Sequence, residues 1–389
     1  MLDQLTLTNF SDLRRQLDAV GPEPNQSSGI PPACYADDGL LNLEQRAIFR
    51  RGWLSLGTAD RWPNSGDYST FDVGGVPIIV VRNKAGQLKV FANSCRHRGS
   101  TMLEGSGQCK KIKCPFHWWT YDLDGHLKVY PRMEQAVDFD PADNSLVEFP
   151  AETRFGLLFV SFADDPPVLD EWLGDFDDFH APWRLDDLVT TRVREFEVSC
   201  NWKTFIEVFN EYYHLPAVHP DSINWLYPDP DPADRTSGAY TTQFGPTEGA
   251  SALMSESQDQ ALPAGEGLEG RYRLGTRYTW IYPNLTFAAS QDSLWMYQAY
   301  PLTADRSWIV QTVAFPSASV ALDDFEERAK HYYTRIDAAL DEDLPFLEKQ
   351  QHGLNSPFAK PGRFGTLEPS VGNFAYWYCR QMLGELESN

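Results

Sequence analysis

The stretches Cys95-Arg96-His97-Arg98-Gly99 and Cys114-Pro115-Phe116-His117 decide what the first half of this chain builds. Each stretch contains one cysteine and one histidine, and 16 residues lie between the two pairs. The chain has only 6 cysteines in 389 residues, which is not the pattern of a disulfide framework. Only Cys95 and Cys114 have histidine partners at ligand spacing. The two stretches therefore predict a metal centre.

The residue types within each pair indicate which metal. Two thiolates on one iron and two imidazoles on the other define a Rieske [2Fe-2S] cluster. A structural zinc site also uses two cysteines and two histidines, but zinc modules usually pair cysteine with cysteine and histidine with histidine. We therefore expect Cys95, His97, Cys114 and His117 to hold the cluster, and zinc is the alternative.

Short strand patterns separated by turn signals surround the two pairs. We expect strands at 76–81, 88–92, 112–114, 127–130 and 156–162. These strands predict a small all-β domain over residues 51–165. Residues 1–50 combine helical patterns with a stretch rich in proline and glycine, and we interpret them as an N-terminal arm associated with the second domain.

The second domain is expected over residues 166–389, in keeping with the usual division of a chain of this length. Its pattern predicts a strand at 193–199, a helix at 202–213, at least three antiparallel strands over 272–315 and a long helix at 322–351. The expected fold class is α+β, with a helix packed over an antiparallel sheet. Residues 228–270 show no periodicity and predict a long mobile loop or lid.

Composition excludes several partners. The chain has 33 basic and 55 acidic residues, a net charge of -22, so nucleic acid and anionic membranes would be repelled. No secretory signal or long apolar run is visible, and we expect a cytoplasmic protein. No glycine-rich dinucleotide fingerprint occurs, so electrons from NAD(P)H would need a separate reductase.

The first domain resembles that of the oxygenase (alpha) subunits of Rieske non-haem iron oxygenases. Beyond the two cluster stretches, it shares their Trp119-Thr120-Tyr121 and Asp124-Gly125 motifs. One departure is Trp118, where the family often has a small residue, so the surface beside the cluster is expected to be bulky. The resemblance implies a START-like helix-grip catalytic domain, mononuclear Fe(II), O2 as co-substrate, a flavin and iron-sulfur reductase with or without a ferredoxin, and a homotrimer.

A second metal site is expected at His214 and His219. Non-haem Fe(II) oxygenases use two histidines and one carboxylate on one face of the metal, which leaves positions for O2 and substrate. Residues five apart do not share a face of a straight helix, so we expect Pro216 to break the helix and return His219 toward His214. Glu211 shares a helical face with His214 and is one candidate for the carboxylate.

The family resemblance implies a different carboxylate. In Rieske oxygenases the third ligand comes from a late helix similar to residues 341–351, which implies Asp343, with Glu342 or Asp341 as the neighbouring registers. The resemblance gives Glu211 another role, a bridge from His117 of one chain's cluster to His214 of the next chain. A carboxylate that orients a ligand histidine has the same physical rationale.

The metal ligands do not choose between ring hydroxylation, dioxygenation and N-demethylation. Glutamate at position 211 and the run Asn210 to His214 resemble the branch that acts on quaternary ammonium compounds such as betaine, carnitine and choline. A cation needs aromatic faces, and the candidates are Trp225, Tyr278, Trp280, Tyr282, Trp295 and Tyr297. The alternatives are a mono- or dioxygenase of an aromatic acid, and an electron-transfer Rieske protein without catalytic iron.

Overall fold

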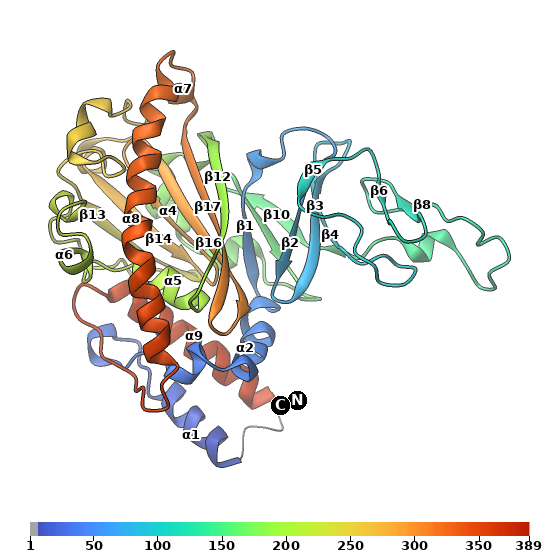
Figure 1. Ribbon diagram of the computed structural model, residues 1–389, viewed down its shortest axis with the longest axis horizontal. Helices are drawn as coiled ribbons and strands as arrows, with labels where there is room; N and C mark the ends of the chain where they lie inside the picture. The colour runs from blue at the N-terminus through green and yellow to red at the C-terminus, as the bar shows by residue number, and fades with distance from the viewer. Residues whose placement is uncertain (1–6, 389) are drawn as a thin grey trace. The chain divides into compact units, whose positions relative to one another are not determined.

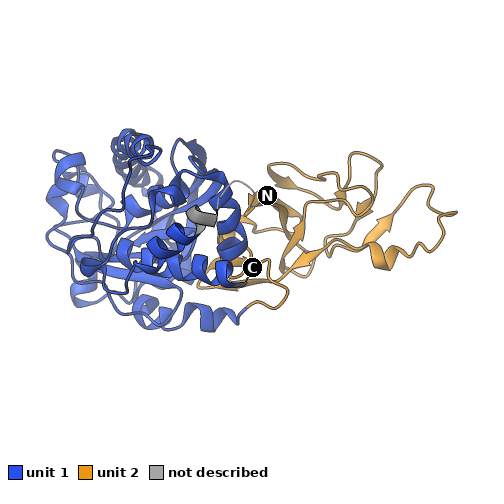
Figure 2. Ribbon diagram, turned by 90° about the horizontal axis from the view of Figure 1, so that it is seen from below, with its two compact units in different colours: residues 1–49, 167–389 blue, residues 50–166 orange. Residues whose placement is uncertain are grey.

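The computed structural model describes residues 7–388 and divides the chain into two compact units (Figure 2). Unit 2 is the continuous segment Arg50–Pro166. Unit 1 combines Met1–Phe49 with Pro167–Asn389. The chain thus leaves unit 1 once, after Phe49, and returns to it at Pro167.

Unit 2 consists of short antiparallel strands in three sheets, ordered β5-β2-β3-β4-β9, β1-β11-β10 and β6-β7-β8. The strands are β1 Trp53–Thr58, β2 Asp67–Val73, β3 Val76–Arg82, β4 Leu88–Ala92, β5 Ser106–Gln108, β6 Ile112–Lys113, β7 Thr120–Tyr121, β8 Leu127–Val129, β9 Glu148–Phe149, β10 Ala151–Arg154 and β11 Leu157–Ser161. Phe91, Ile112 and Tyr121 belong to one buried cluster that also contains Cys95 and Cys114. The predicted all-β fold is confirmed, and its core supports both cysteine loops.

Unit 1 is built on one six-stranded antiparallel sheet, ordered β12-β17-β16-β15-β14-β13 (Figure 1). The strands are β12 Leu188–Val198, β13 Tyr240–Pro246, β14 Gly275–Ile281, β15 Leu285–Ala289, β16 Leu294–Thr303 and β17 Arg306–Pro316. In the register, Ala288 on β15 lies between Tyr278 on β14 and Trp295 on β16. The small side chain of Ala288 leaves space between two large rings on the same face.

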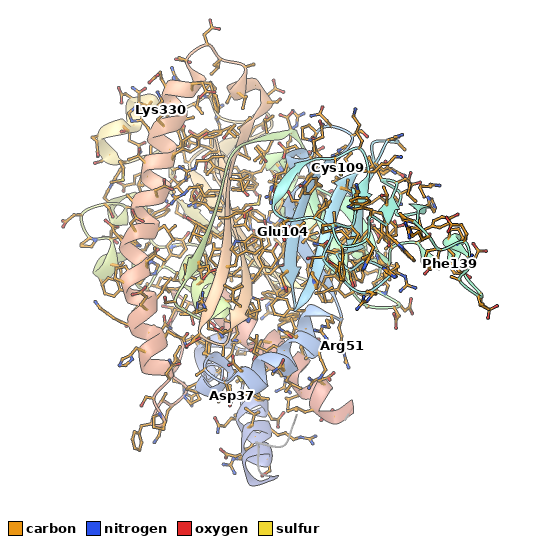
Figure 3. All side chains as sticks on the ribbon, turned by 45° about the vertical axis from the view of Figure 1, so that its right-hand side comes forward. Asp37, Arg51, Glu104, Cys109, Phe139 and Lys330 are labelled. Carbon is orange, nitrogen blue, oxygen red and sulfur yellow. The ribbon has the colours of Figure 1, made fainter. Side chains whose placement is uncertain are left out.

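Unit 1 also contains α-helices. They are α1 Leu7–Asp18, α2 Asp38–Glu44, α3 Leu169–Leu173, α4 Phe176–His180, α5 Trp202–Phe209, α6 Leu215–Val218, α7 Ser317–Val320, α8 Phe325–Leu354 and α9 Pro369–Ser388. Of these, α5, α7 and α9 contact strands of the sheet. The long helix α8 crosses one face of the sheet (Figure 1), burying Tyr332, Ile336 and Leu340 while Lys330 points to solvent (Figure 3). The helix-over-sheet prediction is confirmed. No helix within residues 7–388 has the length and apolar character needed to cross a membrane.

The expected secondary structure was wrong in two segments of unit 1, 228–270 and 202–213. Residues 228–270 are not one irregular loop, because Tyr240–Pro246 forms the edge strand β13. Its polar side chains are buried and hydrogen-bonded, as in the 2.8 Å contact between Thr242 Oγ1 and Thr279 Oγ1, so the strand lacks an apolar alternation. The helix expected at 202–213 ends at Phe209, and the Asn210 side chain bonds Thr286 on β15 at 2.9 Å.

A buried acid on α5 gives unit 1 a testable pH dependence. Glu207 accepts a 2.6 Å hydrogen bond from Tyr35, and burial raises the pKa of its carboxyl from 4.5 to about 7. A raised folded-state pKa means that the native state binds more protons, so stability falls as the pH rises from 4.5 through 7. Between pH 5 and pH 8, we expect the free energy of unfolding of Glu207→Gln to increase relative to that of the wild type by up to roughly 3 kcal/mol.

Urea unfolding at the two pH values measures this gain. The exposed Glu197 on β12 provides the matched control, since Glu197→Gln removes a carboxylate that stays in water. An equal offset of Glu207→Gln from the wild type at both pH values would contradict the assignment of the raised pKa to Glu207.

Candidate metal centres

Two closed loops in unit 2 carry the cluster candidates. In the first loop, Cys95 N–H donates to Ser100 O at 2.9 Å and Gly99 N–H donates to Cys95 O at 2.8 Å. Gly99 has φ +74°, a conformation that costs glycine little. The second loop is closed by Cys114 N–H, which donates to Trp119 O at 2.8 Å. Backbone hydrogen bonds therefore fix the position of each cysteine.

The four side chains have the arrangement that a Rieske cluster requires. Cys95 and Cys114 are buried, while His97 and His117 lie nearer the surface with their ring centroids 4.7 Å apart. The Nδ1 atom of His97 is buried and has no hydrogen-bond partner, as expected of an atom whose lone pair binds metal. The Tyr121 hydroxyl lies 3.4 Å from Cys95 Sγ, and such contacts to the sulfur ligands tune the potential. These residues fit a [2Fe-2S] cluster.

The surface beside the two imidazoles carries two exposed aromatic rings. Phe116 is 57% exposed and Trp118 is 61% exposed, and Lys113 Nζ lies 4.7 Å from the Trp118 ring centroid. Trp118 has φ +64°, which costs a non-glycine residue about 1–2 kcal/mol. The bulk expected from the sequence is therefore present, and the loop holds this tryptophan at an energetic cost.

The two histidines of the second centre flank a one-turn helix. His214 is the residue before α6 and His219 is the residue after it. Pro216 lies in the first turn of α6, where its missing N–H costs nothing. The expectation that Pro216 breaks a longer helix was therefore wrong, because α5 has already ended at Phe209. One helical turn between the two histidines brings their imidazoles together.

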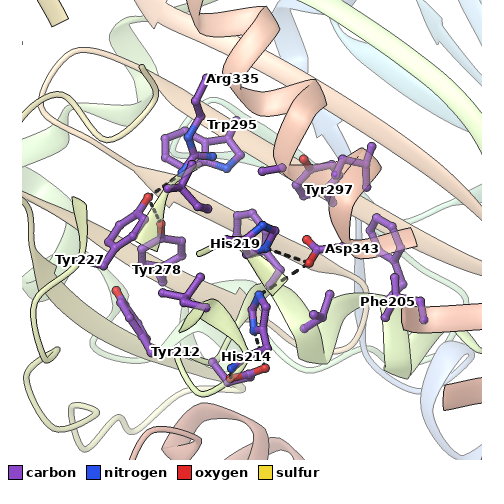
Figure 4. A pocket seen from close by; sticks show the side chains of 18 residues that line it. Phe205, Tyr212, His214, His219, Tyr227, Tyr278, Trp295, Tyr297, Arg335 and Asp343 are labelled. Atoms are coloured by element: carbon purple, nitrogen blue, oxygen red, sulfur yellow. Dashed lines mark hydrogen bonds and ion pairs between the residues drawn. The ribbon is translucent and has the colours of Figure 1, made fainter. Parts of the chain in front are cut away.

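The second centre is a cluster of two histidines and one carboxylate (Figure 4). Asp343 Oδ1 lies 2.9 Å from His219 Nε2 and 3.6 Å from His214 Nε2, and the three candidate ligand atoms all lie within 4.8 Å of one another. Asp343 Oδ1 is buried and has no hydrogen-bond partner. Three atoms that converge on one point without hydrogen bonds fit a divalent cation with the 2-His-1-carboxylate donor set of non-haem iron.

Outer carboxylates hold both imidazoles. Glu211 Oε1 lies 2.5 Å from His214 Nδ1, and Glu342 Oε2 lies 2.5 Å from His219 Nδ1. Such contacts fix the tautomer and aim each Nε2 at the metal. Burial opposes the charged form of His219, but the adjacent carboxylates of Asp343 and Glu342 outweigh it and raise its pKa. The surroundings of this centre favour positive charge.

The structure separates the three acids considered for the third ligand on α8. Asp343 faces the two Nε2 atoms. Glu342 contacts the other nitrogen of His219, Nδ1, and also accepts a 2.6 Å hydrogen bond from Ser222. Asp341 is exposed. Glu211 is not in the three-residue cluster. Its second carboxylate oxygen accepts hydrogen bonds from the backbone N–H groups of Tyr213 and His214.

A small cavity of about 70 Å³ adjoins the histidine cluster. Of the six predicted pocket aromatics, Tyr278, Trp295 and Tyr297 line it (Figure 4). The other side chains that line it and that the sequence did not single out include Phe205, Phe209, Tyr212, Tyr227 and Arg335. A basic residue in the apolar stripe of α8 was the available signal for Arg335.

The other three predicted aromatics do not line this cavity. The Trp280 ring stacks on Phe374 of α9, with centroids 3.8 Å apart. Tyr282 packs on Phe374 and Trp377, and Trp225 is partly exposed and donates to Ser222 O. The sequence analysis did not predict helix α9. This helix covers that end of the sheet, and the rings of Trp280 and Tyr282 pack against it.

Comparison with known families identifies the class. Residues 52–150 match the Rieske [2Fe-2S] domain, and residues 180–384 match the catalytic domain of the ring hydroxylating alpha subunit. The chain belongs to the ring hydroxylating alpha subunits, the oxygenase components of Rieske non-haem iron oxygenases. Its cofactors are a Rieske cluster and a mononuclear iron, and it receives electrons from a reductase.

The chain is similar in sequence to two curated oxygenase subunits and in fold to a solved structure. The glycine betaine monooxygenase oxygenase subunit of Chromohalobacter salexigens is 30% identical, over 100% of this chain and 94% of that protein. The carnitine monooxygenase oxygenase subunit of Acinetobacter baumannii is 25% identical, over 86% and 87%. The crystal structure of the quaternary ammonium Rieske monooxygenase CntA with γ-butyrobetaine has a TM-score of 0.76 at 22% identity, over 92% and 96% of the two chains.

The fold is shared equally with a ring-hydroxylating enzyme. Naphthalene 1,2-dioxygenase from Rhodococcus sp., bound to indole, has a TM-score of 0.79 at 19% identity and covers 98% of this chain. The backbone alone therefore does not distinguish N-demethylation from ring oxidation.

Proposed function

We propose that this chain removes an N-methyl group from a small quaternary ammonium compound of the betaine, carnitine or choline type. The observation that carries the proposal is the ring of aromatic side chains beside the histidine cluster. Around the cavity, the Phe209 ring contacts those of Tyr278 and Tyr297, with centroids 5.6 and 5.1 Å apart. Aromatic faces bind a quaternary ammonium group, and the relatives named for betaine and carnitine support this class of substrate.

The metal-binding roles follow from the geometry. We assign Cys95, His97, Cys114 and His117 to the [2Fe-2S] cluster in the domain at residues 51–165. His214, His219 and Asp343 would hold the mononuclear iron in the domain at 166–389. When bound, this iron supplies reductive activation of O2. Glu211 and Glu342 keep both Nε2 atoms aimed at the metal, and the aromatic lining excludes bulk water and orients the methyl group.

The reaction balances with two electrons and two protons. One oxygen atom of O2 enters a C–H bond of an N-methyl group, and the other leaves as water. The resulting hydroxymethyl ammonium group then breaks its C–N bond, releasing formaldehyde and a proton and leaving the tertiary amine. The electrons come from NAD(P)H through the reductase, with or without a ferredoxin.

We further propose that the electrons cross between chains of a homotrimer. Glu211 would accept a hydrogen bond from His117 of a neighbouring chain while holding His214 of its own. Its side chain is 12% exposed, and its Oε1 lies 2.5 Å from His214 Nδ1. The cytoplasm is the compartment we assign, since a reducing environment keeps the four cysteines outside the cluster as thiols.

Formaldehyde release tests the proposed reaction. The purified holoenzyme is supplied with a surrogate reductase, NADH and a panel of glycine betaine, L-carnitine, choline and aromatic acids. We expect formaldehyde and the matching tertiary amine in equal amounts from at least one quaternary ammonium compound. Hydroxylated ring products without formaldehyde from any methylated amine would overturn the proposal in favour of ring oxidation.

A further inference from the structure

We infer that Arg335 is the anchor for a carboxylate of the substrate, and that the cavity therefore selects short zwitterions over choline. This inference rests on the proposed function and narrows it. Arg335 lines the cavity (Figure 4) and is 3% exposed. A binding site for an anion beside a set of cation-binding rings defines a substrate that carries both charges.

The guanidinium is buried without a counter-charge. Within the part of the chain that the structure describes, no carboxylate lies at ion-pair distance from Arg335. Its Nε atom is buried and has no hydrogen-bond partner, and its NH2 group donates to Tyr227 Oη at 2.7 Å. An unpaired buried charge is costly, whereas a carboxylate pairs with arginine through two parallel hydrogen bonds. The ligand is the available source of that carboxylate.

Tyr227 provides a second donor at the same place. Its Oη accepts hydrogen bonds from both Arg335 and Tyr278, at 2.7 and 2.8 Å, so its own proton has no acceptor among the described residues. Burial raises the pKa of Tyr278, which keeps that phenol a neutral donor. Arg335 and Tyr227 together present unused N–H and O–H groups to an anion.

The rings divide into two functions. Trp295 lies 5.2 Å from the Arg335 guanidinium carbon, so one charged group already occupies its face. Tyr297 and Phe209 pack together with centroids 5.1 Å apart, in the part of the cavity that His214, His219 and Asp343 also line. The ammonium group would therefore sit near Tyr297 and Phe209, toward the histidine cluster, and the carboxylate near Arg335.

Helix α8 sets the length of the substrate. Arg335 and Asp343 are eight residues apart on it, which is about 12 Å along the axis. The cavity that both residues line has a volume of only about 70 Å³, which favours a compound with one or two carbons between ammonium and carboxylate, such as glycine betaine, over γ-butyrobetaine.

Matched ligands test the anchor. We expect the holoenzyme to bind glycine betaine more tightly than choline at equilibrium. We also expect it to bind 3,3-dimethylbutanoate, which has the carboxylate without the cation. Arg335→Gln should weaken glycine betaine and 3,3-dimethylbutanoate by roughly 10- to 100-fold and leave choline within about threefold. Arg335→Lys should fall between, since lysine keeps the charge but loses the fork of donors.

Two controls keep the outcome clear. Arg328→Gln removes an arginine from the same helix whose partners, Asp324 and Ala261 O, lie outside the cavity, and it should change none of the three affinities. Equal losses for choline and glycine betaine in Arg335→Gln would overturn the anchor. Absence of formaldehyde from every quaternary compound would refute the proposed function instead, because the binding of 3,3-dimethylbutanoate still reports on Arg335.

Discussion

Asp343→Ala should lose the mononuclear iron and retain the cluster. Anaerobically purified protein would fall from three iron atoms per chain to two, because the 2-His-1-carboxylate set loses its only anionic ligand while the thiolate and imidazole ligands in the other unit are unchanged. Turnover should fall by more than about 100-fold, since mutating even an outer hydrogen-bond partner of a metal ligand typically lowers metal affinity or activity by 10- to 100-fold. Iron analysis and the visible absorption of the cluster measure the two parts separately.

Neighbouring acids on α8 supply the matched controls for Asp343→Ala. Asp341→Ala removes an exposed carboxylate two residues away and should keep all the iron. Glu342→Gln should weaken iron binding less than Asp343→Ala, because it alters only the support of His219. Full iron content in Asp343→Ala together with a loss in Asp341→Ala would refute the assignment of the third ligand.

Glu211→Gln should block electron transfer while keeping the iron. The amide oxygen of glutamine still accepts a hydrogen bond from His214 Nδ1, so the ligand stays oriented, but the negative charge of the proposed bridge is lost. We expect product formation to fall by roughly 10- to 100-fold, while the reductase reduces the cluster at the normal rate. Stopped-flow absorption of the cluster, first with the reductase and then with O2 and substrate, separates the two steps.

Mixed oligomers test whether the electrons cross between chains. A His117→Ala chain keeps its mononuclear site but lacks a complete cluster, and an Asp343→Ala chain keeps its cluster but lacks the iron site. Each variant alone should be inactive, and co-expressed chains should recover a measurable fraction of activity. Adding Glu211→Gln to the His117→Ala chain should abolish the recovery. An inactive mixture of correctly assembled oligomers would show that the interchain path is wrong.

The sequence predicted most of the chemistry because metal ligands are named by residue type and spacing. The mixed Cys/His pairs alone indicated a Rieske cluster, and two histidines called for a nearby acid. The choice among Asp341, Glu342 and Asp343 needed the family pattern. The spacing did not show that Glu342 also supports His219. Glu342 and Asp343 are adjacent on α8, and only the folded structure shows that they lie at opposite nitrogens of the His219 ring.

The pocket was harder to predict because it depends on which helix covers which strand. Trp280 shares a sheet face with Tyr278, but α9 packs over it and removes it from the cavity. The edge strand β13 escaped notice because its buried threonines and glutamine give no apolar alternation. Arg335 is visible in the sequence, but an arginine on a helix usually points to solvent. Only the burial of its side chain in the structure shows that it belongs to the pocket.

One continuous helix, α8, carries both the proposed anchor and a metal ligand. Loops change length freely in evolution, but the separation between two positions on a helix changes only when an anchor moves by a full turn, about 5.4 Å. Relatives adapted to longer or shorter substrates would then shift the basic residue by three or four positions along α8, rather than enlarge the cavity gradually. Substrate length in this branch would be discontinuous, graded by helical turns.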